Sequence, residues 1–62
     1  MTEEILQAAI LKLRSKALEQ YGIIKDIYHR PATTESVDKI AQHALALAQI
    51  EGAIITLQQY SG

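Results

Sequence analysis

Apolar residues in the first half of the chain recur at the spacing of a helix face. The repeat runs through Leu6, Ile10, Leu13, Ala17, Tyr21, Ile24 and Tyr28. Steps of four and three residues keep side chains on one face of an α-helix. The order of the steps gives a roughly eleven-residue repeat, close to the period of a straight helix, and predicts little left-handed supercoil.

This repeat continues past Gly22, although a glycine weakens a helix by about 1 kcal/mol relative to alanine. We therefore expect one helix over about 3–29, with Thr2 as its N-cap. An alternative ends the helix at Tyr21 and begins a strand at Ile23. The chain offers no second strand pattern to pair with it, so the continuous helix is favoured.

The second half of the chain is apolar around more of its circumference. One stripe is large: Ile40, His43, Leu47, Ile50, Ile54 and Leu57. Another is mostly small: Val37, Ala41, Ala44, Ala48, Gly52 and Ile55. We expect a helix over about 35–60. A helix that is apolar over more than half its circumference packs against neighbours on more than one side.

The two predicted helices are separated by one clear break, a loop over about 30–34. Pro31 cannot continue a helix, because its ring removes a hydrogen bond and clashes with the preceding turn. Thr33 or Thr34 can then cap the second helix. A short loop makes the two helices antiparallel neighbours. The predicted fold is all-α, a two-helix hairpin that forms a single domain over residues 1–62.

One hairpin cannot cover all of this apolar surface. Leu11 and Leu18 form a second line on the first helix, roughly 120° from its main stripe. We therefore expect a homo-oligomeric helical bundle, with a four-helix dimer as its smallest form. The expected interface residues are Leu11, Leu18, Leu47, Ile50, Ile54 and Leu57.

Composition removes several classes of protein. The chain has 62 residues, a formal net charge of -1 and no cysteine, which excludes disulfide-built folds and cysteine zinc sites. The balanced charge disfavours binding to duplex nucleic acid or to a membrane surface. No catalytic or metal-binding motif is present, so we expect no enzyme, no metal and no cofactor. No apolar run approaches the roughly 18 residues of a membrane span, so the expected location is the cytoplasm.

Two polar pairs are predicted from the antiparallel register. Glu51 falls inside the apolar arc of the second helix, where an unpaired carboxylate is costly. Counting back from the loop places Arg14 at its level, so we expect an Arg14–Glu51 pair within or between subunits. A partly exposed Glu51 and a Glu51 that contacts a ligand are the alternatives. The same counting places Tyr21 beside His43, as a hydrogen bond or as the wall of a pocket.

Polar residues around the loop form a candidate anion site. The expected ligand-binding residues are Lys25, Tyr28, His29, Arg30, Thr33 and Thr34. They flank a helix N-terminus, whose free N–H groups and dipole favour phosphate. Arg30 can clamp a phosphate and Tyr28 can stack on a base. The alternative is purely local, because the same residues can end one helix and cap the next.

The segment Tyr28-His29-Arg30-Pro31 and the closing run from Ala48 to Ile55 give the chain its resemblance to known proteins. In architecture it resembles the small phage anti-defence sponge proteins of the anti-CBASS and anti-Thoeris kind, and also the RNA-binding Rop-like hairpins. The first resemblance implies multimers that sequester nucleotide signals at subunit boundaries. The mixed charges of the first helix disfavour the RNA-binding interpretation.

These observations predict a non-enzymatic oligomeric binding protein. The leading hypothesis is sequestration of a phosphorylated small molecule, such as a nucleotide signal, between subunits. The alternative is a structural or regulatory module that offers an apolar helix surface to another protein: an assembly chaperone, a virion component or an inhibitor. A Leu11 and Leu18 line left uncovered by self-association would favour a protein partner.

Overall fold

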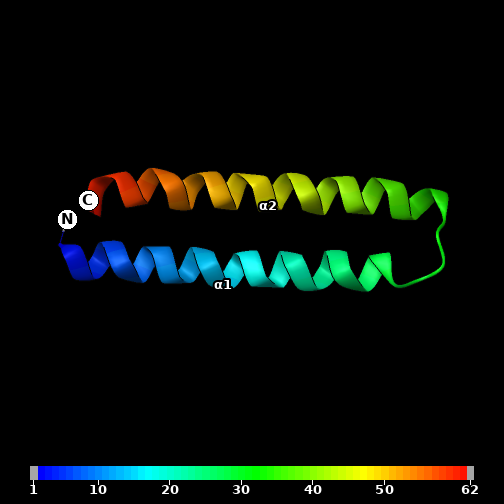
Figure 1. The fold of residues 1–62 in the computed structure, drawn as a ribbon, viewed down its shortest axis with the longest axis horizontal. Helices are drawn as coiled ribbons and strands as arrows, with labels where there is room; N and C mark the ends of the chain where they lie inside the picture. Colours follow the sequence, from blue (N-terminus) through cyan, green and yellow to red (C-terminus); the bar gives the residue numbers. More distant parts are fainter. Residues whose placement is uncertain (1, 62) are drawn as a thin grey trace.

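The computed structural model describes residues 2–61 and consists of two long antiparallel helices (Figure 1). Helix α1 covers Glu3–Tyr28 and helix α2 covers Thr34–Ser61. The helices lie side by side, with the loop at one end of the hairpin and both termini at the other. Their ends fall within one residue of the expected positions. The hairpin is elongated, with Cα extents of 46 × 14 × 13 Å.

Local sequence signals explain where both helices begin and end. The Thr2 side chain accepts a hydrogen bond from the backbone N–H of Ile5 at 3.3 Å and caps α1. Before α2, the Thr33 hydroxyl accepts a hydrogen bond from the backbone N–H of Ser36 at 3.1 Å. Gly22 lies inside α1, and residues 2–61 contain no strand. The alternative strand at Ile23 was therefore wrong.

The face of α1 that packs on α2 differs from the predicted stripe. Tyr21 and Tyr28 are 50% and 76% exposed, so the prediction was wrong at these two positions. Gln20 and Ile27 are half-buried in their place. The packed positions are Leu6, Ile10, Leu13, Ala17, Gln20, Ile24 and Ile27. Their alternating steps of four and three residues make a heptad repeat, which is typical of left-handed coiled-coil packing rather than of straight helices.

The facing side of α2 follows the same heptad repeat. Its half-buried positions include Ser36, Ile40, His43, Leu47, Ile50, Ile54 and Leu57. The large stripe predicted from the sequence therefore packs against α1 within the chain. Leu47, Ile50, Ile54 and Leu57, which were expected at an oligomer interface, form part of the hairpin's own core. They are half-buried rather than buried, so each keeps apolar surface exposed.

This core is small. Among the described residues only Leu6, Ile10 and Ala17 are buried, and none of them belongs to α2. The hairpin exposes 4859 Å². A compact monomer of 6.9 kDa exposes about 4,000 Å². The difference, roughly 900 Å², measures how much surface two helices alone leave uncovered.

The hydropathy of α2 bears on one expectation. Its segment Thr34–Tyr60 is long and apolar enough to cross a membrane by length and composition, with a hydropathy of 1.3. The expectation concerned uninterrupted apolar runs, of which α2 has none near that length, so the expected location stays a prediction. Insertion depends instead on the average over the whole helix. The core helix of a soluble assembly meets the same criterion.

Candidate functional site

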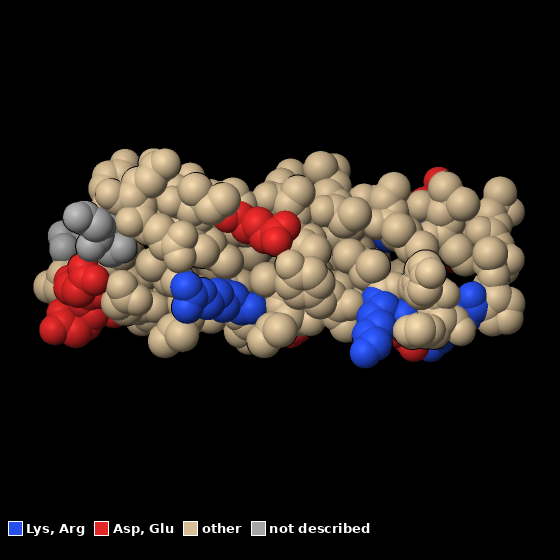
Figure 2. All heavy atoms as spheres, viewed as in Figure 1, with Lys and Arg blue, Asp and Glu red and all other residues tan. Residues whose placement is uncertain are grey.

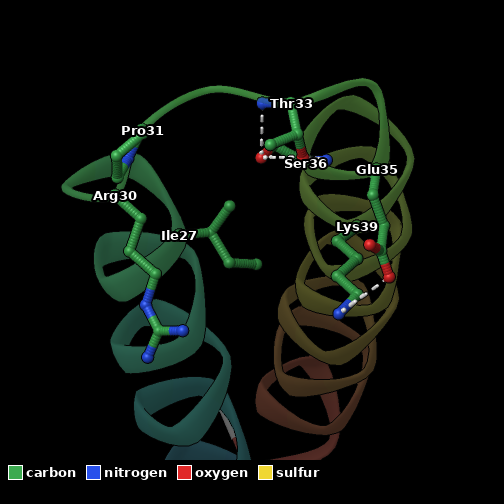
Figure 3. Close-up of a pocket in the computed structure, with 7 residues that line it drawn as sticks. All are labelled: Ile27, Arg30, Pro31, Thr33, Glu35, Ser36 and Lys39. Atoms are coloured by element: carbon green, nitrogen blue, oxygen red, sulfur yellow. Dashed lines mark hydrogen bonds and ion pairs between the residues drawn. The ribbon is translucent and has the colours of Figure 1, made fainter.

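A shallow cleft lies where the loop joins the two helices (Figure 3). Its volume is about 370 Å³, and its lining residues are Ile27, Arg30, Pro31, Thr33, Glu35, Ser36 and Lys39. Figure 3 shows Ile27 pointing into the space between the helices, with Glu35 and Lys39 on the α2 side. Apolar carbon from Ile27 and Pro31 and two basic side chains thus surround one opening.

Both basic side chains of the cleft form ion pairs with an acidic residue four positions earlier in the chain. Arg30 Nη2 lies 2.8 Å from Asp26 Oδ2, and Lys39 Nζ lies 3.4 Å from Glu35 Oε1. All four side chains are more than half exposed, and exposed pairs of this kind contribute little to stability. An anion can therefore recruit either cation at small cost, but it must compete with a carboxylate for each.

The hydroxyl groups of the cleft complete the start of α2. Ser36 Oγ accepts a hydrogen bond from the backbone N–H of Thr33 at 3.1 Å, while Thr33 Oγ1 accepts one from the backbone N–H of Ser36. The two hydroxyls also lie 3.0 Å apart. This reciprocal capping satisfies one of the N–H groups that an anion would otherwise bind. Thr33 therefore has the local role that was the alternative to ligand binding.

The structure brings together only part of the predicted anion site. Arg30 and Thr33 line the cleft. The side chains of Lys25, Tyr28, His29 and Thr34 are exposed and lie outside its lining. The rings of Tyr28 and His29 meet edge to face, with centroids 5.5 Å apart.

Five lining residues were not among the expected ligand-binding residues: Ile27, Pro31, Glu35, Ser36 and Lys39. Pro31 had been considered only as a helix breaker. The four-residue spacing of Glu35 and Lys39 on one helix was a signal for an ion pair beside the loop. Ile27 can be recognised as a packed residue only once the heptad repeat of α1 is known.

The polar contacts between the helices also differ from those predicted. The Tyr21 hydroxyl donates a hydrogen bond to Glu51 Oε2 at 3.0 Å, and His43 Nδ1 lies 2.8 Å from Gln20 Oε1. Arg14 forms no ion pair within the described chain, and Glu51 is exposed rather than buried. The predicted Tyr21–His43 contact was therefore replaced by two other contacts. The hydrogen bond to Glu51, and then the negative charge of Glu51, raise the pKa of Tyr21.

Six of the ten large exposed apolar side chains in the described residues lie on one side of the hairpin. We call it the tyrosine–leucine face, defined by its large exposed members Leu11, Leu18, Tyr21, Tyr28, Val37 and Ile55. Each of these residues directly follows a packed position in the chain, as Leu11 follows Ile10 and Val37 follows Ser36. In the heptad repeat they therefore lie on the same side of the packed stripe. The hydrogen bond between Tyr21 and Glu51 shows that the two flanks meet. Figure 2 shows one broad side of the hairpin, where uncharged side chains cover most of both helices.

Histidine and acidic side chains do not gather into a metal site in the described residues. No cluster of three or more histidine or acidic side chains that could hold a metal lies within residues 2–61. The cleft and the tyrosine–leucine face are the two candidate sites that the described residues offer. The chain matches no protein-family model, and no curated protein and no solved structure shows significant similarity to it.

Proposed function

We propose that this chain is a non-enzymatic binding protein that works as a homo-oligomer in the cytoplasm. The observation that carries the proposal is the amount of large apolar side chain left in solvent by one hairpin. Leu11, Leu18 and Val37 are 62%, 70% and 68% exposed. Soluble proteins rarely expose contiguous apolar patches of this kind unless the patch binds something.

Self-association would cover this apolar surface without a second kind of protein. Two hairpins that reached the compactness of one globular protein of their combined mass would bury about 3,000 Å² in total. That area falls in the range of obligate homodimers, about 2,000–5,000 Å². A charged residue such as Glu51 near the middle of α2 disfavours the alternative in which α2 spans a membrane.

Native mass spectrometry of gently purified protein tests the proposal. We expect a discrete multimer whose subunit count persists as the protein is diluted. A monomer at every concentration, or a monomer that binds phosphatidylcholine vesicles, would overturn the proposal. The same spectrum reports any small molecule that is retained, which bears on what the oligomer binds.

A second candidate function is sequestration of a phosphorylated small molecule, which the cleft favours. Arg30 and Lys39 bring two cations to one opening, and Ile27 and Pro31 supply apolar surface for the remainder of a ligand. Isothermal titration with mixed mono- and dinucleotides, comparing wild type with Arg30→Ala, tests this candidate. Tyr28→Phe is a control, because Tyr28 lies outside the cleft lining. Equal affinity of wild type and Arg30→Ala for every ligand would remove it.

A second protein as the occupant of the apolar face is the remaining alternative. It predicts that purified hairpins stay monomeric and soluble only at low concentration, since nothing of their own would cover Leu11 and Leu18. An apolar dye that fluoresces on exposed hydrophobic surface separates the cases. Strong dye binding by the purified protein favours a separate partner, and weak binding favours self-association.

A further inference from the structure

The two broad sides of the hairpin differ in charge. The tyrosine–leucine face holds six of the ten large exposed apolar side chains in the described residues. The flank on the other side of the heptad repeat, and the surface behind it, hold most of the charges: Lys12, Lys16, Glu19, Asp26, Arg30, Glu35 and Lys39. The sequence therefore singles out one side of the hairpin for burial.

On this face the two helices differ in the size of their side chains. Helix α1 contributes leucine and tyrosine, namely Leu11, Leu18, Tyr21 and Tyr28. Helix α2 contributes a run of exposed small residues, Ala41, Ala44 and Ala48, between Val37 and Ile55. Large side chains pack best into the grooves beside small ones. The α1 part of the face is therefore complementary to the α2 part and not to a second α1.

The charges on the face have the same complementarity. Arg14 lies seven residues before Tyr21, which in a heptad repeat is the same side of α1. Arg14 lies six residues before Gln20 on α1, and Glu51 lies eight residues after His43 on α2. Because the helices are antiparallel, both offsets run in the same direction from the Gln20–His43 contact. At 1.5 Å per residue these offsets are about 9 and 12 Å, so the two residues lie at a similar level. The face thus carries Arg14, Lys25 and Glu4 on α1 and Glu51 on α2, and Arg14 is the cation level with Glu51.

We propose that a second copy of this chain docks on the tyrosine–leucine face around a two-fold axis parallel to the helices. Helix α1 of each copy then packs on α2 of the other, and Arg14 lies opposite the partner's Glu51. An axis perpendicular to the helices would instead stack α1 on α1, with leucine against leucine, and would leave Glu51 against alanine without a cation. The arrangement rests on the proposed function, because it specifies how the oligomer forms.

Two leucines of similar exposure test the face. Leu18 on the face is 70% exposed, and Leu45, on the side of α2 away from α1, is 63% exposed. Analytical ultracentrifugation of Leu18→Glu should show a dimer dissociation constant raised roughly 30-fold or more, as for an interface hot spot. Leu45→Glu should change it by less than about threefold. Circular dichroism of both variants shows whether the helices remain folded.

A mixing experiment tests the arrangement and does not depend on the folding of the leucine variants. Arg14→Glu alone and Glu51→Arg alone each place like charges opposite one another twice in a dimer, so each should dimerise more weakly than wild type. In an equimolar mixture of the two variants, both pairs are again opposite in charge. We expect heterodimers to predominate, whereas a pair formed within one chain would gain nothing from mixing.

The possible failures are distinguishable. A wild-type protein that stays monomeric removes the proposed function together with this inference. An oligomer that survives Leu18→Glu but dissociates with Leu45→Glu leaves the proposed function standing and overturns the choice of face. Loss of the dimer with Leu18→Glu, without preferential heterodimers on mixing, overturns the two-fold axis proposed here.

Discussion

The Tyr21 hydroxyl donates a hydrogen bond to the Glu51 carboxylate, 3.0 Å away on the other helix. Side chains on a helix lean toward its N-terminus, so in antiparallel helices these two long side chains lean toward each other. The contact therefore forms although the register predicted from the loop placed Glu51 level with Arg14. It joins the two helices inside the tyrosine–leucine face, where the flanks of α1 and α2 meet.

This contact predicts a loss of stability at alkaline pH. Glu51 raises the pKa of Tyr21 above its ordinary value of 10.0, because the protonated phenol donates to the carboxylate and a phenolate would be repelled by it. The stabilisation is therefore complete below about pH 10 and is lost as the pH rises through the raised pKa. Ultraviolet titration of tyrosinate in a Tyr28→Phe, Tyr60→Phe background should show Tyr21 titrating late.

Glu51→Gln provides the matched control for that titration. It keeps a hydrogen-bond acceptor but removes the charge, so the pKa of Tyr21 should fall back toward its ordinary value. The alkaline transition in thermal unfolding should move with it. An unchanged Tyr21 titration in Glu51→Gln would contradict the assignment of the shift to Glu51.

A polar layer inside the coiled coil predicts strong coupling between two substitutions. Gln20 and His43 are half-buried, and His43 Nδ1 lies 2.8 Å from Gln20 Oε1. Gln20→Leu or His43→Leu alone leaves one polar group without its partner and should lower the free energy of unfolding by about 1–2 kcal/mol. The double variant should recover most of this loss or exceed wild type, because leucine suits both heptad positions. Urea unfolding of the four proteins gives the coupling, and strictly additive changes would argue against the contact.

The two threonines before α2 predict different capping contributions. Thr33 is the residue whose hydroxyl accepts from the backbone N–H of Ser36, and Thr34 is the first residue of the helix. Thr33→Ala should therefore lower the free energy of unfolding by about 1 kcal/mol. Thr34→Ala should change it by only a few tenths, since alanine favours a helix. Equal losses for the two variants in urea unfolding would show that capping is not the cause.

The hairpin was predictable because its determinants are local. Pro31 ends one helix and Thr33 begins the next, whatever the rest of the chain does. The packed face of α1 was harder to predict from the sequence, because after Ala17 the repeat can continue either to Gln20 or to Tyr21. A hydrophobicity pattern selects tyrosine, whereas the heptad of the partner helix and the hydrogen-bonding capacity of His43 select glutamine.

The candidate binding surfaces were predictable only in part for a related reason. Arg30 and Thr33 were identified because chemistry near a helix N-terminus is visible in sequence. The orientation of Tyr28 depends on the heptad phase, which is set by two helices together. In that phase Tyr28 is exposed, so it lies outside the cleft lining and belongs to the tyrosine–leucine face.

Glycine replacement offers a final prediction that also reports on assembly. A Cβ added at Gly22 or at Gly52 would meet nothing within 4 Å, and both residues lie inside helices. Gly22→Ala should therefore raise the free energy of unfolding by about 0.5–1 kcal/mol, because alanine loses less backbone entropy. In an isolated hairpin Gly52→Ala should do the same. Gly52 lies seven residues after Leu45, on the same side of α2 and outside the tyrosine–leucine face, so its gain should equal that of Gly22→Ala in the assembled protein as well. Thermal unfolding at high and low protein concentration checks this prediction: a gain for Gly52→Ala that shrinks at high concentration would mean that a second chain approaches Gly52, and would contradict the proposed face.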